Sequence, residues 1–168
     1  MVYLGDRYMR PVVNRTEFLA EFPNSYGKKA GKPKLIAKGL NLLDVCLDER
    51  GDYIPGKTTL IVTAGSVQSL KLLLAIMNHP IAMFYMKERY PAASYNQGTS
   101  FTKDMINSYP LPKMSEADVV GLVSMVDEVL DQRSRQNSSD IIEGRIRSRI
   151  FDLYQLNEAD IVKVEPAS

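Results

Sequence analysis

The chain has 168 residues, of which 45% are hydrophobic and 24% are charged, with one cysteine and a formal net charge of +1. This composition predicts a globular chain and excludes a disordered one. The near-zero charge excludes a global basic field of the kind that attracts nucleic acid. No apolar run reaches the ~18–20 residues of a membrane span, and the first ten residues lack the apolar core of a signal peptide. Cys46 alone excludes an internal disulfide framework and a cysteine-rich zinc site, so an intracellular location is expected.

The first predicted elements are a short helix and three strands. Residues 15–22 are helix-like, with Thr16 near the cap. Residues 34–41, 43–48 and 57–64 are closely spaced and contain β-branched residues, which favours an antiparallel or mixed sheet. The Arg50-Gly51-Asp52 turn between the second and third strands predicts a hairpin tip.

Two helices separated by Asn78-His79-Pro80 follow the strands. Ser66 is placed to cap the first, residues 66–78, which is apolar almost all round and is therefore predicted to be buried on most sides. Proline is tolerated in the first turn of a helix but not in its middle, so a second helix is predicted over residues 80–90. We interpret His79, the only histidine, as a capping or packing residue and not as a catalyst.

The last third of the chain predicts two long amphipathic helices and one more short turn. Ser115 and Asp118 form a capping-box-like start, and apolar residues then recur at spacings of three and four. Ser139 is placed to cap the second long helix. The fold class is therefore predicted to be α+β: a small antiparallel or mixed sheet with packed helices, followed by a C-terminal helical hairpin. Residues 1–113 form the α+β domain in this prediction, and residues 114–168 form a helical appendage that packs on it or projects from it.

The sequence shows no set of residues with a recognisable reaction. Residues 26–34 contain glycine and lysine without the spacing of a phosphate-binding loop, and no dinucleotide fingerprint is present. The acids and the lysine between residues 44 and 57 are the residue types of a nuclease-like cluster, but their spacing fits a turn better. We therefore expect a binding module or a piece of a larger enzyme, with no catalytic residue and no metal ligand in this chain.

Two segments carry a resemblance through their order along the chain. The first, LLLAIMNHPIAMFYMKERY, is a leucine-rich helix, a break at Asn78 and then Phe84-Tyr85. The second, TSFTKDMINSYPLP, contains Thr102-Lys103-Asp104 and ends in a proline-rich run before a capped helix. In this order they resemble the TaqI-like specificity domain of adenine-N6 DNA methyltransferases and of fused type II restriction–modification enzymes. The resemblance covers roughly residues 33–165, and the only departure noted is His79, where the family often has serine.

The resemblance implies that residues 1–113 are a target-recognition domain for double-stranded DNA. Adenine methyltransferases must extrude the target base, and a specificity domain reads the edges of neighbouring base pairs. The family's Asn/Asp-Pro-Pro-Tyr/Phe motif has no match here, so the chain looks like the specificity portion without its catalytic portion. Its implied partners are double-stranded DNA and a catalytic methyltransferase domain of the same polypeptide or complex, without a membrane. S-adenosylmethionine is implied for the parent enzyme only, whose ability to cleave DNA stays open, and the implied location is the prokaryotic cytoplasm.

Polar and basic residues of the loop over 87–104 are the candidates for contacts to bases and phosphates, and the lysines over 28–38 are candidates for contacts to phosphates. The candidate DNA-binding residues are Lys28, Lys29, Lys32, Lys34, Lys38, Lys87, Arg89, Tyr95, Asn96, Gln97, Thr99, Ser100, Thr102 and Lys103. The alternative for the lysines is a solvated loop and strand edge, and the alternative for the loop is a flexible polar connection.

Two other functions stay open at this stage. The apolar stripes of the last two long helices are also typical of a helical protein–protein interaction module with no role in DNA binding. A standalone enzyme with an unrecognised site is the third reading, and one histidine with one cysteine gives it little support.

Overall fold

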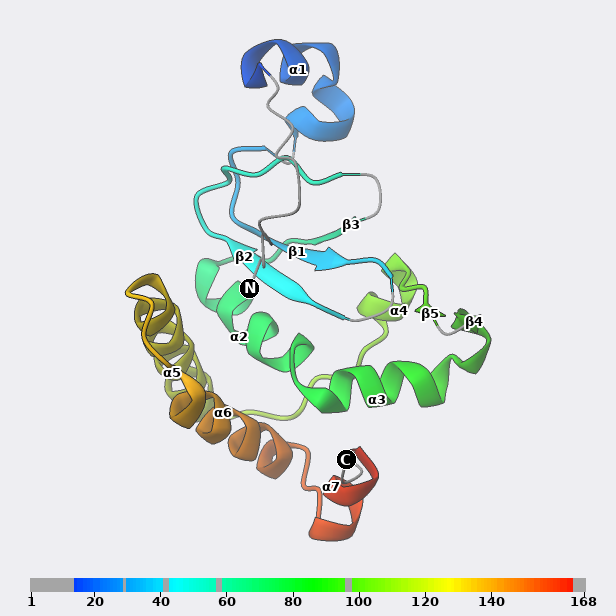
Figure 1. The fold of residues 1–168 in the computed structure, drawn as a ribbon, viewed down its shortest axis with the longest axis vertical. Helices are drawn as coiled ribbons and strands as arrows, with labels where there is room; N and C mark the ends of the chain where they lie inside the picture. Colours follow the sequence, from blue (N-terminus) through cyan, green and yellow to red (C-terminus); the bar gives the residue numbers. More distant parts are fainter. Residues whose placement is uncertain (1–13, 29, 41–42, 57–58, 96–97, 165–168) are drawn as a thin grey trace.

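The structure is a computed structural model that describes residues 14–28, 30–40, 43–56, 59–95 and 98–164 (Figure 1). It is an α+β fold in which a small antiparallel sheet lies beside packed helices and the chain ends in helices. The first half contains α1 (Arg15–Glu21), η1 (Pro23–Gly27), β1 (Lys34–Lys38), β2 (Val45–Asp48), β3 (Thr59–Val62) and α2 (Val67–Met77). The second half contains α3 (Pro80–Arg89), η2 (Pro91–Ala93), β4 (Ser94–Tyr95), β5 (Gly98–Thr99), α4 (Lys103–Asn107), α5 (Glu116–Ser134), α6 (Asp140–Leu153) and α7 (Glu158–Val164).

The three-stranded sheet has the order β2-β1-β3, and both neighbours run antiparallel to β1. Ile36 at the centre of β1 lies opposite Cys46 on one side and Ile61 on the other. Because β1 lies between β2 and β3, those two strands do not form a hairpin, and the prediction of a hairpin tip at Arg50–Asp52 is wrong. The turn after β2 instead folds back over the end of its own strand, as described below.

The junction between α2 and α3 follows the prediction from sequence. The Ser66 hydroxyl accepts a hydrogen bond from the Ser69 N–H at 3.1 Å and caps α2. His79 caps α3, because its Nδ1 accepts from the Ile81 N–H at 3.2 Å, and Pro80 occupies the first turn. The His79 ring is 4% exposed and packs edge-on against Phe151 with the centroids 4.4 Å apart. The interpretation of His79 as a capping and packing residue is confirmed.

Of the other three residues predicted at or near a helix cap, only Ser115 makes a side-chain capping bond. The capping box of α5 is present, with Ser115 and Asp118 bonded to each other's backbone N–H groups. Helix α1 is capped by Asn14 and not by Thr16, since Asn14 Oδ1 accepts from the Glu17 N–H. Ser139 stands at the N-cap position of α6 without a capping bond: its hydroxyl donates to Glu143, which also pairs with Arg133. The Ser139 hydroxyl is engaged by Glu143 and Arg133, so it accepts no hydrogen bond from a backbone N–H in the first turn of α6.

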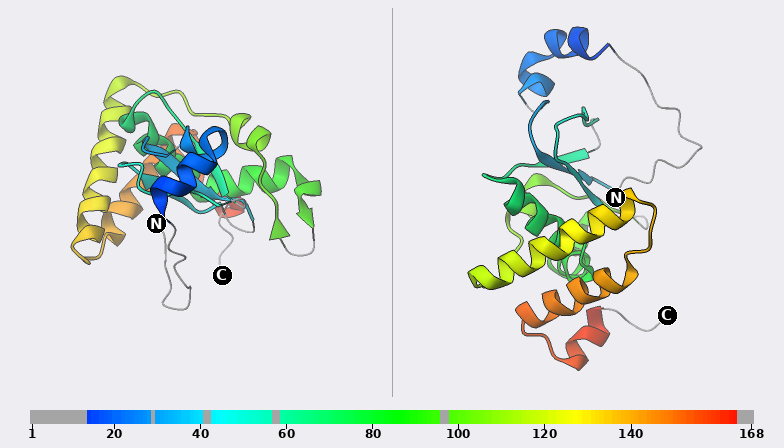
Figure 2. Two further views of the ribbon diagram at one scale, coloured as in Figure 1. Left: turned by 90° about the horizontal axis from the view of Figure 1, so that it is seen from above. Right: turned by 90° about the vertical axis from the view of Figure 1, so that its left-hand side faces the viewer.

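The core lies between the sheet and the helices and extends into the C-terminal helices. One buried cluster joins the strands to α2, α3 and α4 and also takes in Val126 of α5. A second cluster is formed by Ile76, Ile81, Leu122 and Ile150, which come from α2, α3, α5 and α6. The C-terminal helices therefore pack on the rest of the fold (Figure 2). Whether residues 114–168 form a separate domain stays a prediction.

Within the described residues, no single helix combines the length and apolar character needed to cross a membrane. Helices α2 and α3 meet that requirement only as a pair, and they are bent by 69° at the break between them.

Candidate nucleic-acid interface

The predicted lysines divide between the two ends of β1. Lys28 and Lys32 precede the strand and Lys38 ends it, and all three are exposed. Lys34, at the start of the strand, is fully buried. Since an extended chain rises about 3.3 Å per residue, Lys32 and Lys38 lie roughly 20 Å apart along the strand direction. The lysines therefore form two separate groups and not one continuous basic surface.

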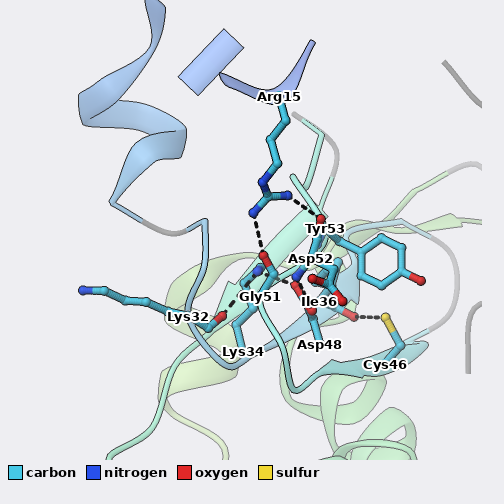
Figure 3. Close-up of polar contacts among 9 residues, drawn as sticks. All are labelled: Arg15, Lys32, Lys34, Ile36, Cys46, Asp48, Gly51, Asp52 and Tyr53. Atoms are coloured by element: carbon cyan, nitrogen blue, oxygen red, sulfur yellow. Dashed lines mark hydrogen bonds and ion pairs between the residues drawn. The ribbon is translucent and has the colours of Figure 1, made fainter. Parts of the chain in front are cut away.

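Lys34 is a structural residue in this fold, which corrects its assignment as a phosphate contact. Its ammonium group pairs with the Asp48 carboxylate across the β1–β2 register, and the two residues are 0% and 3% exposed (Figure 3). The same carboxylate accepts hydrogen bonds from the backbone N–H groups of Asp52 at 2.8 Å and Tyr53 at 3.1 Å. A buried ammonium with a carboxylate partner is not available to a phosphate.

The Asp48 carboxylate also holds the turn at Arg50–Asp52 that was predicted to be a hairpin tip, because the backbone N–H groups of Asp52 and Tyr53 donate to it. Burial raises the pKa of this carboxyl, but the hydrogen bonds from Lys34, Tyr53 and Asp52 lower it more, so that the pKa lies below its ordinary value. In the described part of the chain, no group of three or more histidine, cysteine, aspartate or glutamate side chains is placed to hold a metal ion.

The opposite end of β1 is joined to the segment after β5 by backbone contacts. Leu40 and Ser100 form an antiparallel bridge, and the Phe101 N–H donates to the Gly39 carbonyl at 3.0 Å. The Ser100 N–H donates to the Ala93 carbonyl at 3.0 Å, which ties the same segment to the end of η2. Phe101 is buried and anchors the segment in the core. Residues 60 positions apart are thus held at one corner of the molecule (Figure 1).

We name this surface the β4–β5 corner and define it as the strands β4 and β5, residues 38–40, the last turn of α3 and residues 100–104. Its exposed candidates are Lys38, Lys87, Arg89, Ser100, Thr102 and Lys103. The corner also carries the exposed acids Glu88 and Asp104. Attraction of phosphate would therefore depend on single lysine and arginine side chains and not on a strong overall field.

Three of these candidates also have a local structural role. The Thr102 hydroxyl accepts from the Met105 N–H at 3.3 Å and caps α4. Lys87 and Arg89 lie in the last turn of α3, where cations interact favourably with the helix dipole. The Arg89 guanidinium also lies over the Tyr90 ring, 5.4 Å from its centroid. A loss of DNA binding in variants of these residues must therefore be separated from a loss of stability.

Several candidates fall outside this description. Lys29, Asn96 and Gln97 lie outside the described residues, and so do the side chains of Tyr95 and Thr99. The backbones of Tyr95 and Thr99 belong to β4 and β5, which pair as Ser94 with Thr99 and Tyr95 with Gly98. The predicted loop thus contains a two-stranded hairpin and the short helix α4, neither of which the sequence analysis identified.

A second surface near β1 was not predicted from the sequence. Helix α1 and η1 form a projection above the sheet that we name the aromatic lobe, residues 14–28 (Figure 1). Phe18, Phe22 and Tyr26 pack together there, with centroid distances from 5.0 to 6.1 Å. The aromatic spacing of four residues is the signal that would have indicated this cluster. None of the residues of α1 or η1 is buried, and none belongs to either core cluster.

The proline-rich run before α5 is held by tyrosines. The Tyr154 hydroxyl donates to the Pro110 carbonyl at 2.9 Å, and its oxygen lies 3.0 Å from the Tyr109 hydroxyl, within hydrogen-bond distance. The Tyr109 ring packs edge-on against Tyr85, with the centroids 5.3 Å apart. Burial and the hydrogen bond with Tyr154 raise the pKa of Tyr109, which keeps its hydroxyl neutral. The run thus fixes the direction from which the chain enters α5, and the network has no exposed nucleophile.

Comparisons with known proteins do not assign the chain to a family. No model of a protein family matches the sequence, and no curated protein is significantly similar to it. The function of the chain must therefore be inferred from its residues, their order and their placement in the fold.

Proposed function

We propose that the chain is a sequence-specific DNA-recognition module of a restriction–modification adenine-N6 methyltransferase. In this role it positions double-stranded DNA for base flipping by a separate domain that binds S-adenosylmethionine and carries the catalytic residues. The resemblance of the ordered segments over residues 33–165 supports the proposal. The observation that carries it is the β4–β5 corner, where a short hairpin is held on a buried anchor beside exposed basic and hydroxyl side chains.

The corner has the parts that readout of a duplex requires. A short β-ribbon fits the major groove, and side chains around it can reach base edges and flanking phosphates. Ser100 offers a small polar contact, while Lys38, Lys87, Arg89 and Lys103 offer phosphate contacts or bidentate contacts to guanine. Phe101 and Met105 are both buried below this surface, so that the polar groups stand on a packed base.

Binding of a labelled duplex, followed by fluorescence anisotropy over a range of salt concentrations, tests the proposal. A randomised duplex pool is used first, and selection from that pool then yields a preferred sequence. The variant Lys38→Ala/Lys103→Ala is expected to bind more weakly on all sequences and to reduce the salt slope by about 2, since each phosphate contact contributes about 0.9 to the slope. The matched control Lys113→Ala/Lys163→Ala removes the same charge from exposed positions outside the corner. Absence of binding at low salt by the folded wild-type protein would contradict the proposal.

A second candidate function, a helical protein–protein interaction module, is favoured by one observation. A groove of about 760 Å³ lies between α5 and α6, and Ile141 at its edge is 84% exposed. Single exposed apolar residues are common on protein surfaces, but Ile141 lines this groove and so offers an apolar contact to a segment bound there. This function predicts self-association or capture of a partner helix that Ile141→Asp abolishes and that Val162→Asp, an exposed apolar position on α7, leaves intact. Light scattering over a range of protein concentrations distinguishes the two functions.

A further inference from the structure

The aromatic lobe is held in place by polar contacts at its base and not by burial of its side chains. The Arg15 guanidinium donates to the carbonyls of Asp52 at 2.5 Å and Gly51 at 2.8 Å (Figure 3). The Gly31 N–H donates to the same Gly51 carbonyl at 3.0 Å. These bonds tie the start of the lobe, and the segment that follows it, to the turn that the Lys34–Asp48 pair fixes. The lobe is thus positioned precisely enough to act as a contact surface.

The lobe exposes an aromatic surface, and two exposed lysines follow it along the chain. Phe22 is 39% exposed, and Tyr26 is half-buried against it. Lys28 and Lys32 follow in the sequence, both are exposed, and neither forms an ion pair with another described residue. The lobe also carries Glu17 and Glu21 on α1, but the sequence has no acid between Glu21 and Asp44. The positive charge is therefore concentrated on the side of the lobe that leads into β1.

The lobe and the β4–β5 corner lie at opposite ends of β1, and the C-terminal helices α5 to α7 do not stand between them (Figure 1). Lys32, which follows the lobe, and Lys38 at the corner lie roughly 20 Å apart along the strand, which corresponds to about six base pairs of a duplex at 3.4 Å per base pair. A duplex that is read at the corner can therefore continue to the lobe.

We propose that the aromatic lobe is a second contact site for duplex DNA, which binds the sugar–phosphate backbone outside the sequence read at the β4–β5 corner. Lys28 and Lys32 pair with phosphates, and Phe22 with Tyr26 packs against the apolar faces of the deoxyriboses. The lobe contributes affinity and register but no base specificity, because backbone contacts carry no direct sequence information. This inference rests on the proposed function, since it extends the DNA surface that the corner begins.

The test compares a long and a short duplex of the selected sequence, both with the full chain. The short duplex ends at the corner's site and lacks about six base pairs on the side of the lobe. On the long duplex, Lys28→Ala/Lys32→Ala is expected to lower the slope of log K against log salt by about 1.8. On the short duplex the same variant is expected to bind as the wild type does.

An uncharged variant separates the aromatic contact from the phosphate contacts. Phe22→Ala is expected to weaken binding to the long duplex by several-fold with the salt slope unchanged. Phe22→Tyr keeps the ring and is expected to restore the affinity, and circular dichroism of Phe22→Ala shows whether the lobe keeps its helical structure without the ring. Lys113→Ala/Lys163→Ala serves again as the charge-matched control.

The outcomes distinguish this inference from the proposed function. Salt-sensitive binding of the wild type, with lobe variants that match it on both duplexes, would overturn the lobe as a contact and leave the corner's role intact. An equal loss on both duplexes would also overturn it, because the lobe would then act within the sequence read by the corner or on the fold. No binding by the folded wild type to either duplex would overturn both.

Discussion

The two ends of β1 carry the same residue type and give it opposite roles. Lys34 begins the strand, is buried and is paired with Asp48, whereas Lys38 ends the strand four residues later and is exposed. Both side chains leave the same face of the strand, because successive residues alternate. The difference comes from what covers that face. The turn over residues 49–53 folds across the Lys34 end, and among the described residues no such turn covers Lys38.

The comparison shows how one strand can serve both stability and binding. At the Lys34 end, the buried Asp48 carboxylate pairs with the Lys34 ammonium and accepts hydrogen bonds from two backbone N–H groups. The Lys38 end is fixed through backbone bonds to residues 100 and 101, which leaves its side chain free for a ligand. A basic residue near a strand is therefore a candidate for phosphate binding only where the covering turn leaves it exposed.

The largest effect is expected for Asp48→Ala. The change leaves the Lys34 ammonium buried without its carboxylate and removes the acceptor of the Asp52 and Tyr53 N–H groups. Removal of one partner of a buried pair typically costs about 3–5 kcal/mol, and the free energy of unfolding should fall by that amount. Lys34→Met should cost less, because Asp48 keeps both backbone N–H donors.

Urea unfolding followed by circular dichroism measures these changes, since the chain has no tryptophan. The matched control is Lys38→Met, which changes the same residue type at the exposed end and should shift the free energy of unfolding by less than about 0.5 kcal/mol. Equal changes in the free energy of unfolding for Lys34→Met and Lys38→Met would contradict the different roles of the two lysines.

A smaller loss is expected when Asp48 is neutralised by acid, because a protonated carboxyl still has an oxygen that can accept a hydrogen bond. The pKa of Asp48 is lowered from 3.8 in the folded state, so its ionised form stabilises the fold. This contribution is fully present above the ordinary pKa and is lost as the pH falls through the lowered pKa. The wild type should therefore lose more stability than Asp48→Asn when the pH is lowered from 5 to 2. Parallel stability curves for the two proteins would show that the carboxylate has no such role.

The next effect concerns the backbone of the same turn. Gly51 has a φ of +74°, and a β-carbon there would lie 2.4 Å from the backbone of Gly31. Gly51→Ala must both strain the turn and displace the segment at Gly31 and Lys32 that precedes β1. The free energy of unfolding should therefore fall by about 2 kcal/mol or more. Gly56→Ala is the control, because its β-carbon would meet no atom within 4 Å and its φ is not in the left-handed region. Unfolding midpoints for the two variants in urea should differ clearly, and equal midpoints would show that the turn adapts.

Local signals in the sequence predicted much of the fold. The caps at Ser66, His79 and Ser115, the break before Pro80 and the apolar stripes follow from short-range chemistry, and the structure has them. The α+β class and the antiparallel sheet also follow from the pattern of elements. These features depend on residues within one or two turns of each other, which a single sequence displays directly.

Long-range features of the site were not predictable in the same way. The sheet order places β1 between β2 and β3, so the turn after β2 is not a hairpin, and this depends on pairing across the whole sheet. The burial of Lys34 depends on a partner 14 residues away and on a turn that folds over both. Asn78 also bonds the N–H and carbonyl of Val45, each at 2.9 Å, which protects the outer edge of β2. No spacing rule within the chain indicates such a contact.

The smallest effect is expected at the exposed end of the comparison, for Thr102→Ala. Loss of the hydroxyl that accepts from the Met105 N–H removes the cap of α4, which should lower the free energy of unfolding by about 1 kcal/mol. Thr102→Ser keeps the hydroxyl and should retain most of that stability. DNA affinity then separates two roles of the same side chain. If Thr102 only caps α4, affinity at a temperature where both variants are folded should equal that of the wild type. A loss of affinity in Thr102→Ala that Thr102→Ser restores, measured well below the unfolding transition, would place the hydroxyl in the DNA contact itself, because a helix cap worth about 1 kcal/mol does not change the population of the folded state there.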